Sequence, residues 1–315
     1  MSEPSLSIIV NGNDHAYMRE FGCRCDRCAV SHRRANASAS ICLLSDQDEL
    51  LWHLLIDAGG GVGNNLVENL DGFQGEPRVD LLLLTHWHPD HSIGLLQVCP
   101  SLKRSRERRG LTFDKIPTWV RHGSLALLPD RLTQDFIRVI SQDENEPPGR
   151  LLPAFTGLHG SVTIQPVSIS HASADLNGRY ATAGYVITAP NGRRAAFLWD
   201  MDNQNQWLVS PDPVQAPAQA ALRDLDYLFV DCNNWEAEDL NGRTTSHGSF
   251  LRIRSYAEVL RPRETVLIHI SGHEDGPGNP GFGWPDQVWQ DRAREAWEGL
   301  PGTVSVVSPG ERRPL

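Results

Sequence analysis

The chain has 315 residues, and its 29 basic and 39 acidic side chains give a formal net charge of −10. Such an acidic chain is a poor binder of long nucleic acid or of an anionic membrane, and no apolar run is long enough to cross a bilayer. The first residues lack the basic start and apolar stretch of a signal peptide, so we expect a cytoplasmic protein.

The predicted elements are many short strands and fewer helices. In the first half we expect strands at 6–10, 39–44, 50–56 and 79–84, helices at 64–70 and 131–140, and an exposed loop at 143–149. In the second half we expect strands at 162–170, 184–189, 195–199, 226–230, 266–270 and 304–307, and helices at 249–260 and 287–300. The run 79–84 is apolar apart from Asp80, as in a buried central strand. This pattern predicts an α/β (α+β) fold in which two mixed β-sheets pack face to face with helices outside. We expect one domain over 1–315.

A histidine motif follows the apolar run. It reads His86, His88, Asp90 and His91, with Pro89 inside it. Side chains alternate along an extended backbone, so His86, His88 and Asp90 can face one way. The chain then turns, and His91 can point back from another direction. Neutral imidazole and carboxylate ligands suit Zn²⁺, Mn²⁺ or Fe²⁺, so the motif predicts a metal centre.

The His-x-His-x-Asp-His pattern resembles the metallo-β-lactamase superfamily. The resemblance implies an αββα sandwich with two catalytic divalent metal ions (Zn, Mn or Fe), whose further ligands follow three later strands. His171, Asp200 and His269 come in that order at predicted strand ends. The resemblance therefore implies one metal on His86, His88 and His171, a second on Asp90, His91 and His269, and Asp200 bridging both.

Two of these positions have rivals. His159 competes with His171, but it precedes its strand instead of ending it. Asp202 competes with Asp200, which directly follows an apolar run. Asp57 matches a family position behind the metal histidines, where we expect it to orient their loops.

Three cysteines crowd into residues 21–32, namely Cys23, Cys25 and Cys28. Two disulfides cannot form within such a cluster, and three close thiolates fit one face of a Zn²⁺ tetrahedron. The cluster resembles a branch of the superfamily that includes the cyclic phosphodiesterase of phosphonate degradation and protein B of PQQ biosynthesis. That resemblance implies a structural zinc completed by His273, with His32 as the rival ligand.

The same resemblance suggests the reaction. It implies a metal-dependent hydrolase, foremost a dinuclear phosphodiesterase that attacks a small or cyclic phosphodiester with a metal-bridging hydroxide. Asp90 and His247 are the predicted catalytic residues, His247 as a general acid or phosphate ligand. The alternatives are a metal-dependent oxidoreductase like protein B of PQQ biosynthesis and a lactonase or β-lactamase.

The expected partner is a small, anionic substrate, with no membrane and no long nucleic acid. If the chain associates, a homodimer is expected, because two-fold symmetry is the commonest among soluble oligomers.

Overall fold

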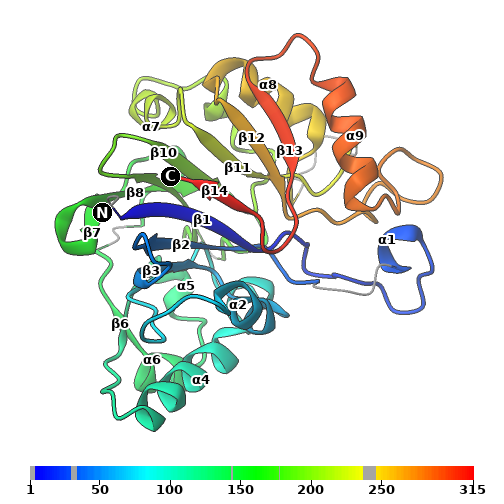
Figure 1. Ribbon diagram of the computed structural model, residues 1–315. Coiled ribbons are helices and arrows are strands. Elements are labelled where there is room, and N and C mark those ends of the chain that lie inside the picture. The colour runs from blue at the N-terminus through cyan, green and yellow to red at the C-terminus, as the bar shows by residue number, and fades with distance from the viewer. Residues whose placement is uncertain (1–3, 30–33, 143–144, 177, 237–245) are drawn as a thin grey trace.

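Two seven-stranded sheets lie face to face in the computed structural model (Figure 1), which describes residues 4–29, 34–142, 145–176, 178–236 and 246–315. The first sheet has the order β14-β1-β2-β3-β4-β5-β6, with β1 at Ser5–Gly12, β2 at Ser38–Leu44, β3 at Leu50–Ile56, β4 at Leu81–Leu83, β5 at Ile116–Trp119, β6 at Ile137–Val139 and β14 at Arg312–Pro314. The second has the order β13-β12-β11-β10-β9-β8-β7, with β7 at Phe155–Gly157, β8 at Val162–Ile169, β9 at Thr182–Thr188, β10 at Arg194–Leu198, β11 at Tyr227–Asp231, β12 at Glu264–Ile268 and β13 at Thr303–Val306. Both sheets are mixed, since β3 to β6 and β10 to β13 run parallel while the other pairs are antiparallel.

The main core fills the space between the sheets. On β3, Trp52 and Leu54 belong to this inner core, whereas Leu55 packs into the cluster on the outer face. On β11, Phe229 faces inward and Leu228 outward. This two-residue alternation is what a strand covered on both sides requires.

Helices cover both outer faces (Figure 1). On the first sheet lie α2 (Val62–Leu70), α4 (Leu95–Arg108), α5 (His122–Leu125) and α6 (Asp130–Asp135), and on the second lie α7 (Ala216–Ala221), α8 (Phe250–Leu260) and α9 (Asp286–Ala296). The short helices α1 (Asp26–Ala29) and α3 (Pro89–Ser92) and the 3₁₀ turns η1 (Leu158–Gly160) and η2 (Gln206–Leu208) complete the described elements. The predicted αββα sandwich is confirmed.

One predicted element is wrong. Residues 131–140 do not form a single helix, because α6 ends at Asp135 and β6 begins at Ile137. Leu132 and Phe136 are both buried in the outer cluster of the first sheet, which satisfies helical spacing. The β-branched side chains of Ile137 and Val139 then continue as a strand paired with β5. A four-residue spacing over such a short run does not separate one helix from a helix followed by an edge strand.

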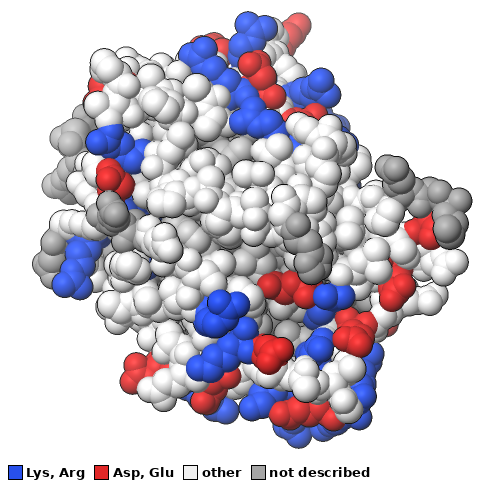
Figure 2. Space-filling view, turned by 90° about the vertical axis from the view of Figure 1, so that its left-hand side faces the viewer, with Lys and Arg blue, Asp and Glu red and all other residues white. Residues whose placement is uncertain are grey.

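Charged side chains of both signs are interspersed at the upper and lower ends of the face shown in Figure 2, and most of the surface between them is uncharged. At α4, basic residues lie beside acidic ones: Lys103 is 4.0 Å from Glu107 and Arg106 is 3.5 Å from Glu76. Among the described residues, no helix is both long and apolar enough to span a bilayer.

Candidate metal centre

The histidine motif follows β4 at its carboxyl end. His88 is the N-cap of α3, with φ −52° and ψ 147°, the extended backbone favoured before a proline. Pro89 then starts the single turn of α3. This turn brings His91 back to His86, and their ring centroids are 4.3 Å apart. The motif therefore converges as its spacing predicts.

A first donor set consists of His86, His88, His171 and Asp200, whose donor atoms all lie within 4.8 Å of one another. The Nδ1 atom of His88 lies 2.9 Å from His86 Nε2 and 3.3 Å from His171 Nε2. Asp200 Oδ2 lies 3.4 Å from His86 Nε2 and 3.5 Å from His171 Nε2. Nitrogen ligands around a tetrahedral zinc are about 3.3 Å apart when each bond is about 2.0 to 2.1 Å long. The spacing of the set fits such an ion.

Hydrogen bonds fix the protons on two of these rings. Thr85 Oγ1 donates to Asp57 Oδ2 over 2.6 Å and can accept from His86 Nδ1 over 3.2 Å. His88 Nε2 donates to the Ser173 carbonyl over 3.4 Å. Burial lowers the pKa of both His86 and His88 below the ordinary value, so the facing atoms His86 Nε2 and His88 Nδ1 both carry lone pairs. Two lone pairs 2.9 Å apart repel, and a metal cation is the partner that fits them.

A second donor set consists of Asp90, His91, Asp200 and His269. His91 Nε2 lies 3.3 Å from Asp90 Oδ2 and 3.2 Å from Asp200 Oδ1. His269 Nε2 lies 3.3 Å and 3.1 Å from the same two oxygens. Asp200 thus turns Oδ1 to the second set and Oδ2 to the first, so a single carboxylate connects the two.

The second set concentrates negative charge around imidazoles. Burial favours neutral His91 and His269, but the carboxylates of Asp200 and Asp90 outweigh it, raising the pKa of His91 well above its ordinary value and that of His269 to about 10. Burial would raise the pKa of Asp200, but the neighbouring imidazoles hold it well below its usual range. A metal ion must displace protons from these rings, so metal binding at this set should weaken in acid.

Residues behind the donor sets orient them. Asp57 Oδ2 accepts from His91 Nδ1 over 2.8 Å, which leaves Nε2 facing Asp90 and Asp200. Asp57 Oδ1 accepts from the Thr85 backbone N–H over 2.8 Å and so holds the start of the motif loop. Asp57 and Asp200, like His269, have positive φ angles (54°, 53° and 61°). This sparsely populated backbone is often found at functional sites.

His247 lies against both donor sets. Its ring stacks on His269 with centroids 4.9 Å apart and lies 5.3 Å from His171. His247 Nδ1 donates to Asp231 Oδ2 over 3.1 Å. Burial opposes protonation of His247, yet the Asp231 carboxylate raises its pKa above the ordinary value. The ring is therefore suited to carry a proton beside the metal centre.

Sequence reasoning missed two residues at this centre. Asp231 is the last residue of β11 and lies 3.4 Å from His269 Nδ1 through Oδ1. Its position at a strand end, like that of Asp200 after β10, was the available signal. His15 follows β1, and its ring centroid lies 5.0 Å from His269 and 5.2 Å from His247. No motif marked His15, because its neighbours here come from the far end of the chain.

The cysteine cluster forms a separate donor set with His273. His273 Nε2 lies 3.6 Å from Cys23 Sγ, 3.4 Å from Cys25 Sγ and 3.3 Å from Cys28 Sγ. A sulfur and a nitrogen bound to one tetrahedral zinc are about 3.6 Å apart, for bonds of about 2.3 and 2.0 to 2.1 Å. Burial raises the pKa of Cys28 to about 11, so a metal cation is needed to hold it as a thiolate. The rival ligand His32 lies outside the described residues.

The two rivals in the metal centre occupy other places. His159 belongs to η1, which precedes β8, whereas His171 follows the opposite end of that strand; the side chain of His159 lies outside the described part of the structure. Asp202 accepts hydrogen bonds from Ser170 Oγ at 2.8 Å and from the Gln204 backbone at 2.9 Å. Asp202 thus supports its own loop.

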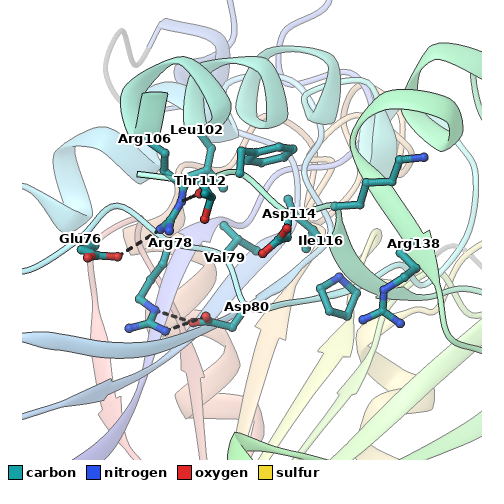
Figure 3. A pocket seen from close by; sticks show the side chains of 13 residues that line it. Glu76, Arg78, Val79, Asp80, Leu102, Arg106, Thr112, Asp114, Ile116 and Arg138 are labelled. Atoms are coloured by element: carbon teal, nitrogen blue, oxygen red, sulfur yellow. Dashed lines mark hydrogen bonds and ion pairs between the residues drawn. The ribbon is translucent and has the colours of Figure 1, made fainter. Parts of the chain in front are cut away.

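A cavity of about 630 Å³ lies at the other end of the first sheet, where β4, β5 and β6 begin (Figure 3). Two ion pairs lie on its rim: Arg78 contacts Asp80 through two bonds of 2.8 Å, and Arg106 lies 3.5 Å from Glu76. The length of β4 separates it from the histidine motif. This cavity is therefore not part of the metal centre.

A sequence model described as the beta-lactamase superfamily domain matches residues 53–270, more than half of the chain. A search of curated proteins by sequence found no match.

Several solved structures have the same fold. A diphosphatase from the PhnP family is 20% identical, with a TM-score of 0.64 over 98% of this chain and 97% of its own. Zinc-bound PqqB from Methylobacterium extorquens is 17% identical, with a TM-score of 0.62 over 98% of this chain and 100% of its own. The short form of human tRNase Z is 13% identical, with a TM-score of 0.61 over 98% of both chains. At these identities the likeness is one of fold.

Proposed function

The chain belongs to the beta-lactamase superfamily of metallo-hydrolases, and from that premise we propose that it is a phosphodiesterase that hydrolyses small or cyclic phosphodiesters with two divalent metal ions. The observation that carries the proposal is the position of Asp200, whose two oxygens face two separate donor sets. A carboxylate shared in this way is the arrangement that two neighbouring ions require.

In this proposal His86, His88 and His171 would hold one ion, Asp90, His91 and His269 would hold the other, and Asp200 would serve both. Two divalent ions bound there, as Zn²⁺, Mn²⁺ or Fe²⁺, would lower the pKa of the attacking water and stabilise charge on the leaving oxygen. Their charge would outweigh that of Asp90 and Asp200, so the site would attract an anion. A phosphodiester suits this charge better than a neutral lactone or lactam does.

His247 supplies the proton in the proposed reaction. The attacking water gives one proton to solvent, its oxygen bonds to phosphorus as the bond from phosphorus to the leaving oxygen breaks, and His247 gives a proton to that leaving oxygen. Asp231 holds the imidazole through Nδ1, and Nε2–H is the proposed general acid. Asp90 orients the attacking water by accepting a hydrogen bond. A third ion, a zinc on Cys23, Cys25, Cys28 and His273, serves the structure and takes no part in the reaction.

The test is hydrolysis of bis(p-nitrophenyl) phosphate by protein loaded with Zn²⁺, Mn²⁺ or Fe²⁺, together with an elemental metal count. We expect turnover that needs metal, disappears in His88→Ala, and consumes no oxygen. His247→Gln should slow cleavage of an alkyl leaving group more than that of p-nitrophenolate, because the poorer leaving group needs the proton more. A full metal complement without turnover would contradict the proposal, and oxygen consumption would favour an oxidoreductase.

A further inference from the structure

His15 lies on a segment that joins the two sheets. After β1, Asp14 forms bridges both to Asn36, beside the first sheet, and to Ile270, just past His269. The His15 backbone N–H donates to the Ile270 carbonyl over 3.3 Å, and its carbonyl accepts from Asn36 Nδ2 over 2.7 Å. The position of His15 is therefore tied directly to the strand end that carries His269.

The ring of His15 packs edge-on against the metal centre. It makes interplanar angles of 78° with His269 and 84° with His247, which stack on each other. His15 Nδ1 accepts a hydrogen bond from the Tyr17 backbone N–H over 3.4 Å. A ring whose Nδ1 accepts carries its proton on Nε2. Only 6% of His15 is exposed, and within the described residues Nε2 has no hydrogen-bond partner.

His15 Nε2 is not among the buried side-chain atoms that lack a partner, so this N–H reaches solvent beside the metal centre and can bond an acceptor that arrives with a ligand. The donor sets of the metal centre are built from His and Asp. On the segment that follows His15, the buried Arg27 and the half-buried Arg34 both bind Asp14, at 2.6 and 2.5 Å. His247 is assigned to the leaving oxygen, so His15 offers the further donor for a phosphoryl oxygen that binds beside His269.

The cysteine loop holds this arrangement in place. Arg27, adjacent to Cys28 in α1, is fully buried and donates to Asp14 Oδ1 over 2.6 Å and to the Ile270 carbonyl over 3.0 Å. The same guanidinium reaches Asp286 at the start of α9 over 2.7 Å. The cluster that orders α1 thus also orders the residue that precedes His15.

We propose that His15 donates a hydrogen bond from Nε2 to a phosphoryl oxygen of the substrate, and that the cysteine loop positions it through Arg27 and Asp14. The proposal rests on the phosphodiesterase function proposed above. It makes His15 a residue that contacts substrate without binding metal, and it gives the cysteine loop a role in substrate binding.

The experiment measures binding of inorganic phosphate to the zinc-loaded full-length chain by calorimetry, with a metal count for every variant. His15→Phe keeps a ring but removes the donor, and His15→Gln restores a donor near the same place. We expect His15→Phe to weaken phosphate binding about tenfold or more at an unchanged metal count, and His15→Gln to recover most of it. Tyr17→Phe is the matched control, because it keeps both the backbone N–H that reaches His15 and the ring that packs edge-on against it.

Equal phosphate affinity in wild type and His15→Phe would overturn the proposal, as would loss of metal from both His15 variants. Its failure is distinguishable from that of the proposed function. An active phosphodiesterase indifferent to His15 would contradict only this inference. A protein inactive on phosphodiesters whose phosphate affinity still depends on His15 would contradict only the proposed function.

Discussion

The two candidate metal regions are built in opposite ways. The His and Asp donors come from the ends of strands in both sheets, and these strands are fixed by the core between them. In the cysteine cluster, three of four donors come from one short segment around α1, where the neighbouring Phe21 is fully exposed. The packed core between the sheets holds the first region, whereas the second has little apolar packing of its own. We therefore expect a metal in the first region to serve catalysis, and a metal in the second region to stabilise the folded state.

The regions are nonetheless connected. His269 and His273 are four residues apart in the segment that leaves β12, and Arg27 bonds to the carbonyl of Ile270 between them. Changes in the cysteine cluster should therefore reach the metal centre, whereas changes in the core-held donors should leave the cluster intact.

The largest expected effect comes from Asp200→Asn, because this carboxylate serves both donor sets. Losing it should lower metal-dependent turnover by about a thousandfold or more, since metal stabilisation of the transition state is worth several kcal/mol. The folded state and the zinc of the cysteine cluster should persist, which circular dichroism and an elemental count would check. Asp202→Asn is the matched control and should stay active. Unfolding of Asp200→Asn would show that the core does not hold this region alone.

Cys28→Ser should disrupt the second region, the cysteine cluster. We expect the loss of about one zinc per chain and of roughly 5 °C or more in the thermal midpoint, because the energy of binding a structural zinc is energy of folding. Calorimetry with a metal count measures both. Cys99→Ala, a buried cysteine outside the cluster, should keep its zinc. Equal zinc contents in the two variants would argue against a zinc site at the cluster.

Asp57→Asn tests whether a hydrogen bond, in addition to the core, orients the ligands of the first region. It weakens the hydrogen bond that orients His91, and such a change costs about 10- to 100-fold in metal affinity. Competition with a chelator would measure it. Asp80→Asn, which changes a carboxylate at the other end of β4, should leave metal affinity as it is. A metal affinity unchanged by Asp57→Asn would mean that the strands alone orient the ligand.

The smallest expected effect concerns His53, which lies outside both regions. Burial lowers the pKa of His53, while its ring contacts the Arg78 carbonyl at 2.7 Å and Ser40 Oγ at 2.8 Å. A histidine whose pKa is lowered by folding contributes stability that is present above its unfolded pKa and lost as pH falls below it. Below about pH 6.5 the contribution of His53 to the free energy of unfolding should fall by up to about 1.4 kcal/mol per pH unit. Urea unfolding of metal-loaded wild type and His53→Gln between pH 7 and 5 should show a flatter profile for the variant, and parallel profiles would contradict the assignment.

Local sequence patterns predicted those elements and turns whose structure depends on residues close in sequence. The strands at 50–56 and 226–230, the turn at Pro89 and the spacing of the cysteines all depend on a few neighbouring residues. The prediction at 131–140 was wrong because the apolar positions there fit both a single helix and a helix followed by a strand. Only the pairing of β6 with β5 distinguishes the two.

The ligands predicted beyond the motif, His171, Asp200 and His269, were placed by resemblance and by their position at strand ends, and the described structure brings all three to the motif. Asp231 also follows a predicted strand, but it was not among the predicted site residues.

The sequence by itself determined the fold class and the metal-binding side chains: an acidic α/β chain with one histidine motif and one cysteine cluster. Tertiary structure alone decided that His15, from the start of the chain, meets His247 and His269 near its end. It also decided that the two oxygens of Asp200 face different donor sets. The physical reason is that such contacts depend on how two sheets pack and on the register of distant strands, and no local pattern records either.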